Sequence, residues 1–271
     1  MININSNYAS SFAANAAKQT SRALDSSIEK LSSGSRINFA RDDAAGQAVA
    51  TRLSAESKSL SIASRNAADA QSMVDTAEGA LQETHTVLLR MRELAVQAAN
   101  GTLQSADRAA VDAEFQQLEA EVNRIANNTK WAGKALLSGA AVTFQVGTAN
   151  TANDRLTVTL PNGTGTNLGI SALAANTVSL AQAAITGIDS AIAKVSEARG
   201  KLGAHSNRLN NTISNLDQVN VNLSASRGRI EDADFATETS NLAKSQILQQ
   251  AATAMLAQAN ASKQTVLALI R

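Results

Sequence analysis

The sequence predicts a mainly α protein: an elongated antiparallel coiled-coil helical rod with a small β-hairpin region and paired terminal helices. Three observations predict this fold class. Apolar residues recur every seven positions over two long stretches, 53–95 and 188–230. The single proline, Pro161, lies mid-chain, so both stretches can be helical without a proline kink. Residues are 44% hydrophobic but only 3% aromatic, which is typical of slender helix seams.

The N-terminal segment, 1–42, is expected to be one part of a helical terminal domain. Its apolar positions Leu24, Ile28 and Leu31 predict a helix that stops at SSGS, because Gly34 suits a helix C-cap. The motif RDDAAGQAV follows, and Asp43 there is expected to cap the long helix after it.

A rod domain is expected over 43–228, built first on a long helix at 43–100. Its seam carries apolar residues seven apart, and at 1.5 Å rise per residue such a helix is about 85 Å long. Leu88, Met91 and Ala95 face the seam, so helix geometry turns Arg90 and Leu94 to the opposite face. Leu94 is then an exposed leucine beside an arginine. It could contact another helix of the same domain or form an intermolecular surface.

The rest of the rod comprises a third helix at 105–128, a β-hairpin region at 140–176 and a second long helix at 180–228. Phe115 and its helically spaced apolar neighbours predict the third helix. Val142 and Phe144 alternate with polar residues, as do Leu156 and Val158, and this period of two predicts paired strands. Heptad positions from Ile188 to Ile230 predict the second long helix.

The C-terminal segment, 229–271, is expected to be the other part of the terminal domain. Its acidic cluster at 231–238 lacks the glycine and the twelfth-position glutamate of an EF-hand loop. Asp232 or Asp234 is instead expected to cap the last helix. The chain ends KQTVLALIR, and an apolar end needs a partner surface. The other terminal helix is the only obvious partner within the chain.

Composition and motifs exclude several classes of function. Cysteine is absent and the formal net charge is only +1, so disulfides, thiolate chemistry and a nucleic-acid or anionic-membrane surface are not expected. The motifs HExxH, GxSxG and GxxxxGK[ST] are missing, and His85 and His205 fall on different predicted helices. We therefore expect no enzyme, no cofactor, no metal and no membrane span. The opening residues also lack the features of a signal peptide.

Three long motifs resemble bacterial flagellin closely. They are LSSGSRINFARDDAAGQAVATRL near the N-terminus, LLRMRELAVQAANGT in the first long helix, and SRGRIEDADFATE with the tail through LALIR. They occur in the family's order, and the resemblance covers residues 1–140 and 185–271.

The resemblance implies a structural subunit that polymerises into the flagellar filament for swimming motility. In flagellins the two chain ends pair as helices of the innermost tube, and here the variable outer insertion is short. The implied polymerisation core is Ile4, Phe12, Leu24, Ile28, Leu31, Leu256, Val266, Leu269 and Ile270. The implied location is extracellular, in the filament, after export by the flagellar type III route without a cleaved signal peptide.

The resemblance also implies partners. The first is the chain itself, in a helical homopolymer, and the others are the flagellar cap and hook-filament junction proteins and an export chaperone at the C-terminal helix. By motif, a Toll-like innate receptor would contact Arg90, Leu94 and Glu114. Two alternatives remain open: a hook-filament junction protein, which shares paired terminal helices, and a coiled-coil signalling or adhesin module.

Overall fold

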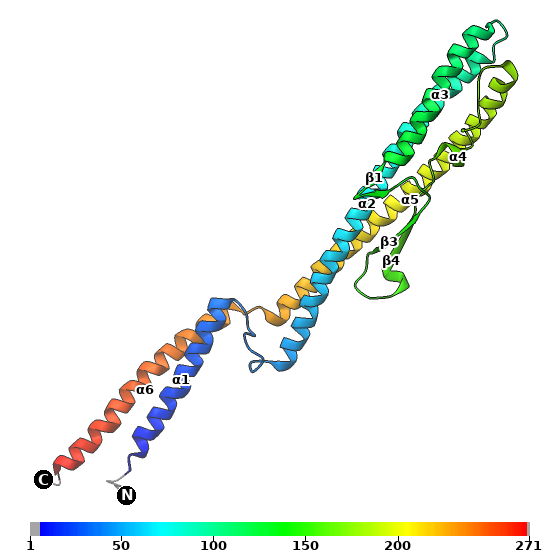
Figure 1. The fold of residues 1–271 in the computed structure, drawn as a ribbon. Helices are drawn as coiled ribbons and strands as arrows, with labels where there is room; N and C mark the ends of the chain where they lie inside the picture. The colour runs from blue at the N-terminus through cyan, green and yellow to red at the C-terminus, as the bar shows by residue number, and fades with distance from the viewer. Residues whose placement is uncertain (1–5, 270–271) are drawn as a thin grey trace. The chain divides into compact units, whose positions relative to one another are not determined.

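The structure is a computed structural model that describes residues 6–269, with side chains as far as Ser262. Its contacts divide the chain into two compact units. We call residues 1–55 with 222–271 the terminal unit and residues 56–221 the central unit. Figure 1 shows the order of the elements, which are almost all helices. The predicted fold class is confirmed.

Six helices, one 3₁₀ turn and four strands follow one another along the described residues. In chain order they are α1 (Tyr8–Ser33), α2 (Ala44–Ala98), α3 (Ser105–Asn128), β1 (Lys130–Trp131), β2 (Lys134–Ala135), β3 (Ala141–Gln145), η1 (Ala152–Asp154), β4 (Arg155–Thr159), α4 (Gly165–Leu168), α5 (Val178–Glu231) and α6 (Phe235–Leu269).

The core of the central unit runs along α2, α3 and α5. Its heptad positions are small or aliphatic on both long helices, and Phe115 of α3 is fully buried among them. Thr84 is buried on the seam, but its hydroxyl is not left without a hydrogen bond, because it donates to the Ala80 carbonyl at 2.9 Å. The largest fully buried side chains are Phe115, Met73, Leu81, Leu88, Met91, Leu94, Leu136, Leu137, Leu160, Ile170, Ile188 and Leu202.

Polar side chains that interrupt the α5 seam find partners on α2. The Arg199 guanidinium donates twice to Glu78 Oε1, at 2.9 and 2.7 Å. Farther along, Ser57 donates to Asn220 Oδ1 at 2.6 Å. The residue numbers on α2 rise as those on α5 fall, as antiparallel packing requires. Cross-helix polar pairs of this kind fix the register of a seam in which many residues are alanines.

The expectation that Leu94 is exposed was wrong. Its side chain is 2% exposed and belongs to the same apolar cluster as Phe115 and Val122 of α3. The two-helix seam alone could not show this, because the opposite face of α2 is covered by a third helix. Of the two alternatives for Leu94, contact with another helix of the same domain is confirmed.

Two antiparallel strand pairs lie beside the helices of the central unit. Strands β3 and β4 pair Val142 with Val158 and Phe144 with Leu156, as the alternation predicts. Leu156 and Val158 are buried in the core, and Asn66 of α2 donates to the Gln145 carbonyl at 3.1 Å. The shorter pair, β1 with β2, turns through Ala132 and Gly133, which both have positive φ.

The terminal unit pairs α1 with α6 and ties their connecting segments together. Gly34 ends α1 with φ of 70°, as a C-cap glycine should. Its carbonyl accepts from Ala233 N at 3.0 Å, and Ser35 forms a β-bridge with Asp232. Asp43 Oδ1 accepts from Gly46 N at 2.8 Å, which confirms the expected cap of α2.

Candidate functional site

The terminal helix pair is the candidate site, and its internal seam is thin. Ala13 and Ser27 of α1 and Ser245 and Ala252 of α6 are the buried seam residues. Burying a methyl group contributes only about 0.8 kcal/mol, against 1.5 to 3 kcal/mol for a leucine. Within itself the pair therefore fully buries fewer large apolar side chains than the central unit, whose seam buries leucine, methionine and phenylalanine.

Polar contacts cap the start of each helix of the pair, and one of them joins the two helices. At the start of α1, Asn7 Oδ1 accepts from Ser10 N at 3.1 Å, and its Nδ2 donates to the Ala259 carbonyl of α6 at 3.3 Å. At the start of α6, Asp234 Oδ1 accepts from Ala236 N at 3.0 Å, and Oδ2 accepts from the Thr237 hydroxyl at 2.7 Å. The Thr237 hydroxyl, together with the backbone amides of Thr237 and Ala236, lowers the pKa of Asp234. Asp234, one of two candidates, is the cap.

Large apolar side chains stand on the outside of the pair. On α1, Tyr8 is 75% and Phe12 73% exposed, and on α6 Ile247 is 66% exposed. Ile28 and Met255 are exposed as well. A monomer rarely leaves so many large apolar side chains in water on one small unit, and such a surface indicates an interaction face.

The nine predicted core residues fall into four groups. Phe12 and Ile28 are exposed, whereas Leu24, Leu31 and Leu256 are half-buried. Val266 and Leu269 belong to α6, but their side chains are beyond those described. Ile4 and Ile270 lie outside the described residues. A shared role for all nine stays a prediction.

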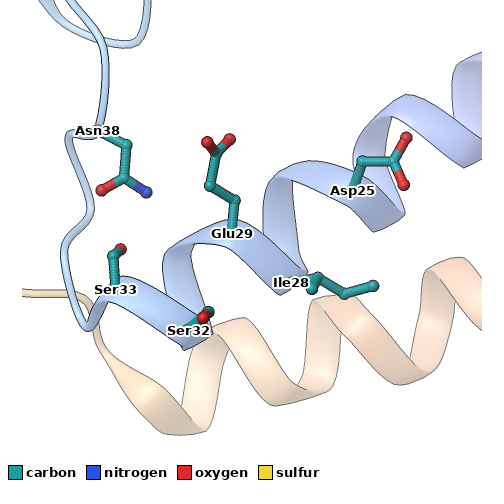
Figure 2. A pocket seen from close by; sticks show the side chains of 6 residues that line it. All are labelled: Asp25, Ile28, Glu29, Ser32, Ser33 and Asn38. Carbon is teal, nitrogen blue, oxygen red and sulfur yellow. The ribbon is translucent and has the colours of Figure 1, made fainter.

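A groove runs beside the C-terminal half of α1. It is lined by Asp25, Ile28, Glu29, Ser32, Ser33 and Asn38, and its volume is about 590 Å³. Figure 2 shows the Asp25 and Glu29 carboxylates on the same side of α1, with the Asn38 amide facing them from the loop after the helix. The sequence did not indicate this groove, because the position of Asn38 depends on how the loop folds back.

In the central unit, the predicted receptor residues divide by exposure. The Arg90 guanidinium donates to Glu114 Oε1 at 2.9 and 3.1 Å and to Glu93 Oε2 at 3.0 Å. These carboxylates raise the pKa of Arg90, with Glu114 the larger cause. Arg90 and Glu114 are half-exposed, but Leu94 is buried, as described above.

Other candidate chemistry does not come together in the described residues. No group of three potential metal ligands occurs among them. Nor does any helix in residues 6–269 have the length and apolar character needed to cross a membrane. His85 lies on α2 and His205 on α5. The pKa of His205 is lowered, mainly because the side chain is partly buried and to a smaller extent because the positive charge of Arg208 is near.

Comparison with known proteins decides the family. The bacterial flagellin N-terminal helical region matches residues 4–142, and the bacterial flagellin C-terminal helical region matches residues 185–270. The chain belongs to the bacterial flagellin family. The N-terminal region contains α1 and the C-terminal region contains α6. Only residues 143–184 lie between the two regions, so this flagellin is a short form.

Individual relatives agree with the family match. A flagellin of Halalkalibacterium halodurans is 45% identical over 251 residues, covering 90% of each chain. A flagellin of Bacillus subtilis is 39% identical over an alignment that covers 99% of each chain. The crystal structure of Bacillus cereus flagellin has a TM-score of 0.50 and 32% identity, and covers 56% of this chain and 88% of its own.

Family membership establishes the general function. This flagellin is a structural subunit that polymerises into the extracellular filament of the bacterial flagellum, which serves motility. The flagellin relatives do not favour the two alternatives, a hook-filament junction protein or a signalling or adhesin module.

Proposed function

We propose that the terminal unit carries the polymerisation of this flagellin. The observation behind the proposal is that the seam between α1 and α6 and the outer surface of this helix pair carry side chains of different size. The fully buried residues described on the α1–α6 seam are alanines and serines, while Tyr8, Phe12 and Ile247 are exposed to water. Burying one such large side chain contributes about 1.5 to 3 kcal/mol. Contact between copies of the chain therefore offers more stabilisation than the seam itself provides.

Folding of the terminal unit is coupled to assembly in this account. Ordering each residue costs about 1 to 2 kcal/mol of backbone entropy, and a seam whose fully buried residues are alanines and serines offsets little of it. Contacts with neighbouring copies bury further apolar side chains, and this burial offsets the remaining entropy cost of ordering the terminal unit. Because the contact joins different surfaces of successive copies, it need not close and can continue as a helical tube.

Deletion of residues 235–271 tests the proposal. This truncation removes α6 and leaves residues 56–221, which form the separate central unit, intact. We expect a soluble, helical protein that does not elongate added filament seeds, while the full chain does. Circular dichroism verifies that the truncated chain stays folded. Efficient elongation by the truncated chain would refute the proposal.

Further partners follow from the resemblance and are part of the proposal. The flagellar cap and the hook-filament junction proteins would contact the growing polymer, and an export chaperone would bind the C-terminal helix before assembly. The chain would leave the cell through the flagellar type III route. Its role is structural rather than enzymatic. Secretion by a strain that lacks this route would contradict the export proposal.

We also propose that a Toll-like innate receptor would contact Arg90 and Glu114. Their paired, half-exposed side chains support this contact, whereas Leu94 would act by holding α2 against α3. An Arg90→Ala variant should activate receptor-bearing cells less strongly than the unchanged chain. Equal activation by the two proteins would remove Arg90 from the contact.

A further inference from the structure

The groove beside α1 carries two carboxylates that form no ion pair within the described residues. Asp25 and Glu29 lie one helical turn apart, and neither forms an ion pair or a side-chain hydrogen bond with any described residue. Ile28 also lines the groove and is 50% exposed. The groove thus combines two free carboxylates with an apolar side chain, which suits a partner with a cation beside apolar groups.

The loop side of the groove supplies an unused hydrogen-bond donor. Asn38 Nδ2 is buried and has no acceptor among the described residues. The backbone of the same residue is fixed, since its amide donates to Asp42 Oδ2 at 3.2 Å. Figure 2 shows the Asn38 amide across from Glu29. A buried donor without an acceptor is costly, so this side of the groove carries an unsatisfied polar group beside the two carboxylates.

The complementary surface lies on α6 of the same chain. Lys244, Ile247, Leu248 and Met255 fall within about 100° of one another around the helix, given 3.6 residues per turn. All four are exposed, and Lys244 makes no ion pair with a described residue. We call these four residues the α6 stripe. It presents a cation beside apolar side chains, which complements the carboxylates and Ile28 of the α1 groove.

The groove and the α6 stripe do not meet within one chain. The bridge between Ser35 and Asp232 and the bond from Asn7 to Ala259 show that α1 and α6 run antiparallel. Relative to the buried seam residues, helix geometry then places the groove and the stripe on opposite sides of the pair. Lys244 accordingly forms no ion pair with Asp25. The cation can reach these carboxylates only from a second copy.

We propose that the α6 stripe of one flagellin copy docks in the α1 groove of the next, with Lys244 between Asp25 and Glu29. This inference rests on the proposed role of the terminal unit and names one of its contacts. The two surfaces differ, so the contact is head-to-tail and can propagate from copy to copy. Ile28 meets the apolar part of the stripe.

Charge reversal with rescue tests the docking. We compare four chains for the amount of sedimentable filament at low ionic strength: the unchanged chain, Lys244→Glu, the double variant Asp25→Lys with Glu29→Lys, and the combined triple variant. Low salt is needed because salt screens exposed charges beyond a Debye length of about 10 Å at 0.1 M. We expect Lys244→Glu and the double variant each to assemble about tenfold less, which corresponds to about 1.4 kcal/mol. The triple variant should recover most of the loss.

Control variants separate the possible outcomes. Lys58→Glu makes the same charge change at an exposed α2 position of the central unit and should assemble normally. Lys244→Arg keeps the cation and should assemble as well. Normal assembly by Lys244→Glu, or failure of the triple variant to recover while its helix content is unchanged, would overturn the docking. Failure of the unchanged chain to polymerise would instead contradict the proposed function.

Discussion

Replacing Leu94 by alanine measures how firmly α2 is held against α3. The side chain is 2% exposed and packs in the cluster that includes Phe115 and Val122. Leucine-to-alanine changes at such sites cost about 2 to 5 kcal/mol, because apolar contacts are lost and a cavity remains. For this long helical seam we expect about 3 kcal/mol, which lowers the melting temperature by about 6 to 12 °C.

Trp131 makes this measurement specific to the central unit. It is the only tryptophan in the chain and lies on β1, so its fluorescence follows unfolding of that unit. Leu89→Ala is the matched control, since Leu89 is 44% exposed on the same helix and should change stability by less than about 0.5 kcal/mol. Equal, small effects of the two substitutions would refute the buried position of Leu94.

Three further predictions concern local features of the central unit. Ala132→Gly should raise the free energy of unfolding by about 1 kcal/mol, because Ala132 has φ of 47°; an unchanged or lower denaturation midpoint would count against this turn. A double-mutant cycle on Arg199 and Glu78 should give about 1 kcal/mol of coupling that weakens with added salt, and zero coupling would show that the pair does not help fix register. His205 has a lowered pKa, so the unfolded chain takes up a proton first as pH falls. Stability should therefore drop as pH passes below the ordinary histidine pKa, and His205→Gln should reduce this drop; an unchanged pH dependence would contradict it.

Heptad spacing was sufficient to predict the long helices because each of them buries a stripe of constant period. Strands β3 and β4 were predictable for the same reason, since one of their faces is buried. Leu94 was misplaced because a two-helix seam does not specify what covers the far side of a helix. The β1–β2 pair, with two residues in each strand, is too short to show a period.

The site was only partly predictable from the sequence. The apolar character of the chain ends and the cap at Asp234 can be read from the residues themselves. Which apolar residues face the seam and which face water depends on how α1 and α6 pair, so Phe12 and Leu31 could not be told apart. The α1 groove needs the loop that brings Asn38 opposite Glu29, and no local pattern encodes that fold-back.

Hydrogen exchange of the same protein as monomer and as filament tests the central claim most directly. The claim is that the terminal unit gains its stable structure by joining other copies. Amides of α1 and α6 should exchange rapidly in the monomer and slowly in the filament, whereas amides in the core of the central unit should be slow in both. Equal, strong protection of α1 and α6 in monomer and filament would contradict the account.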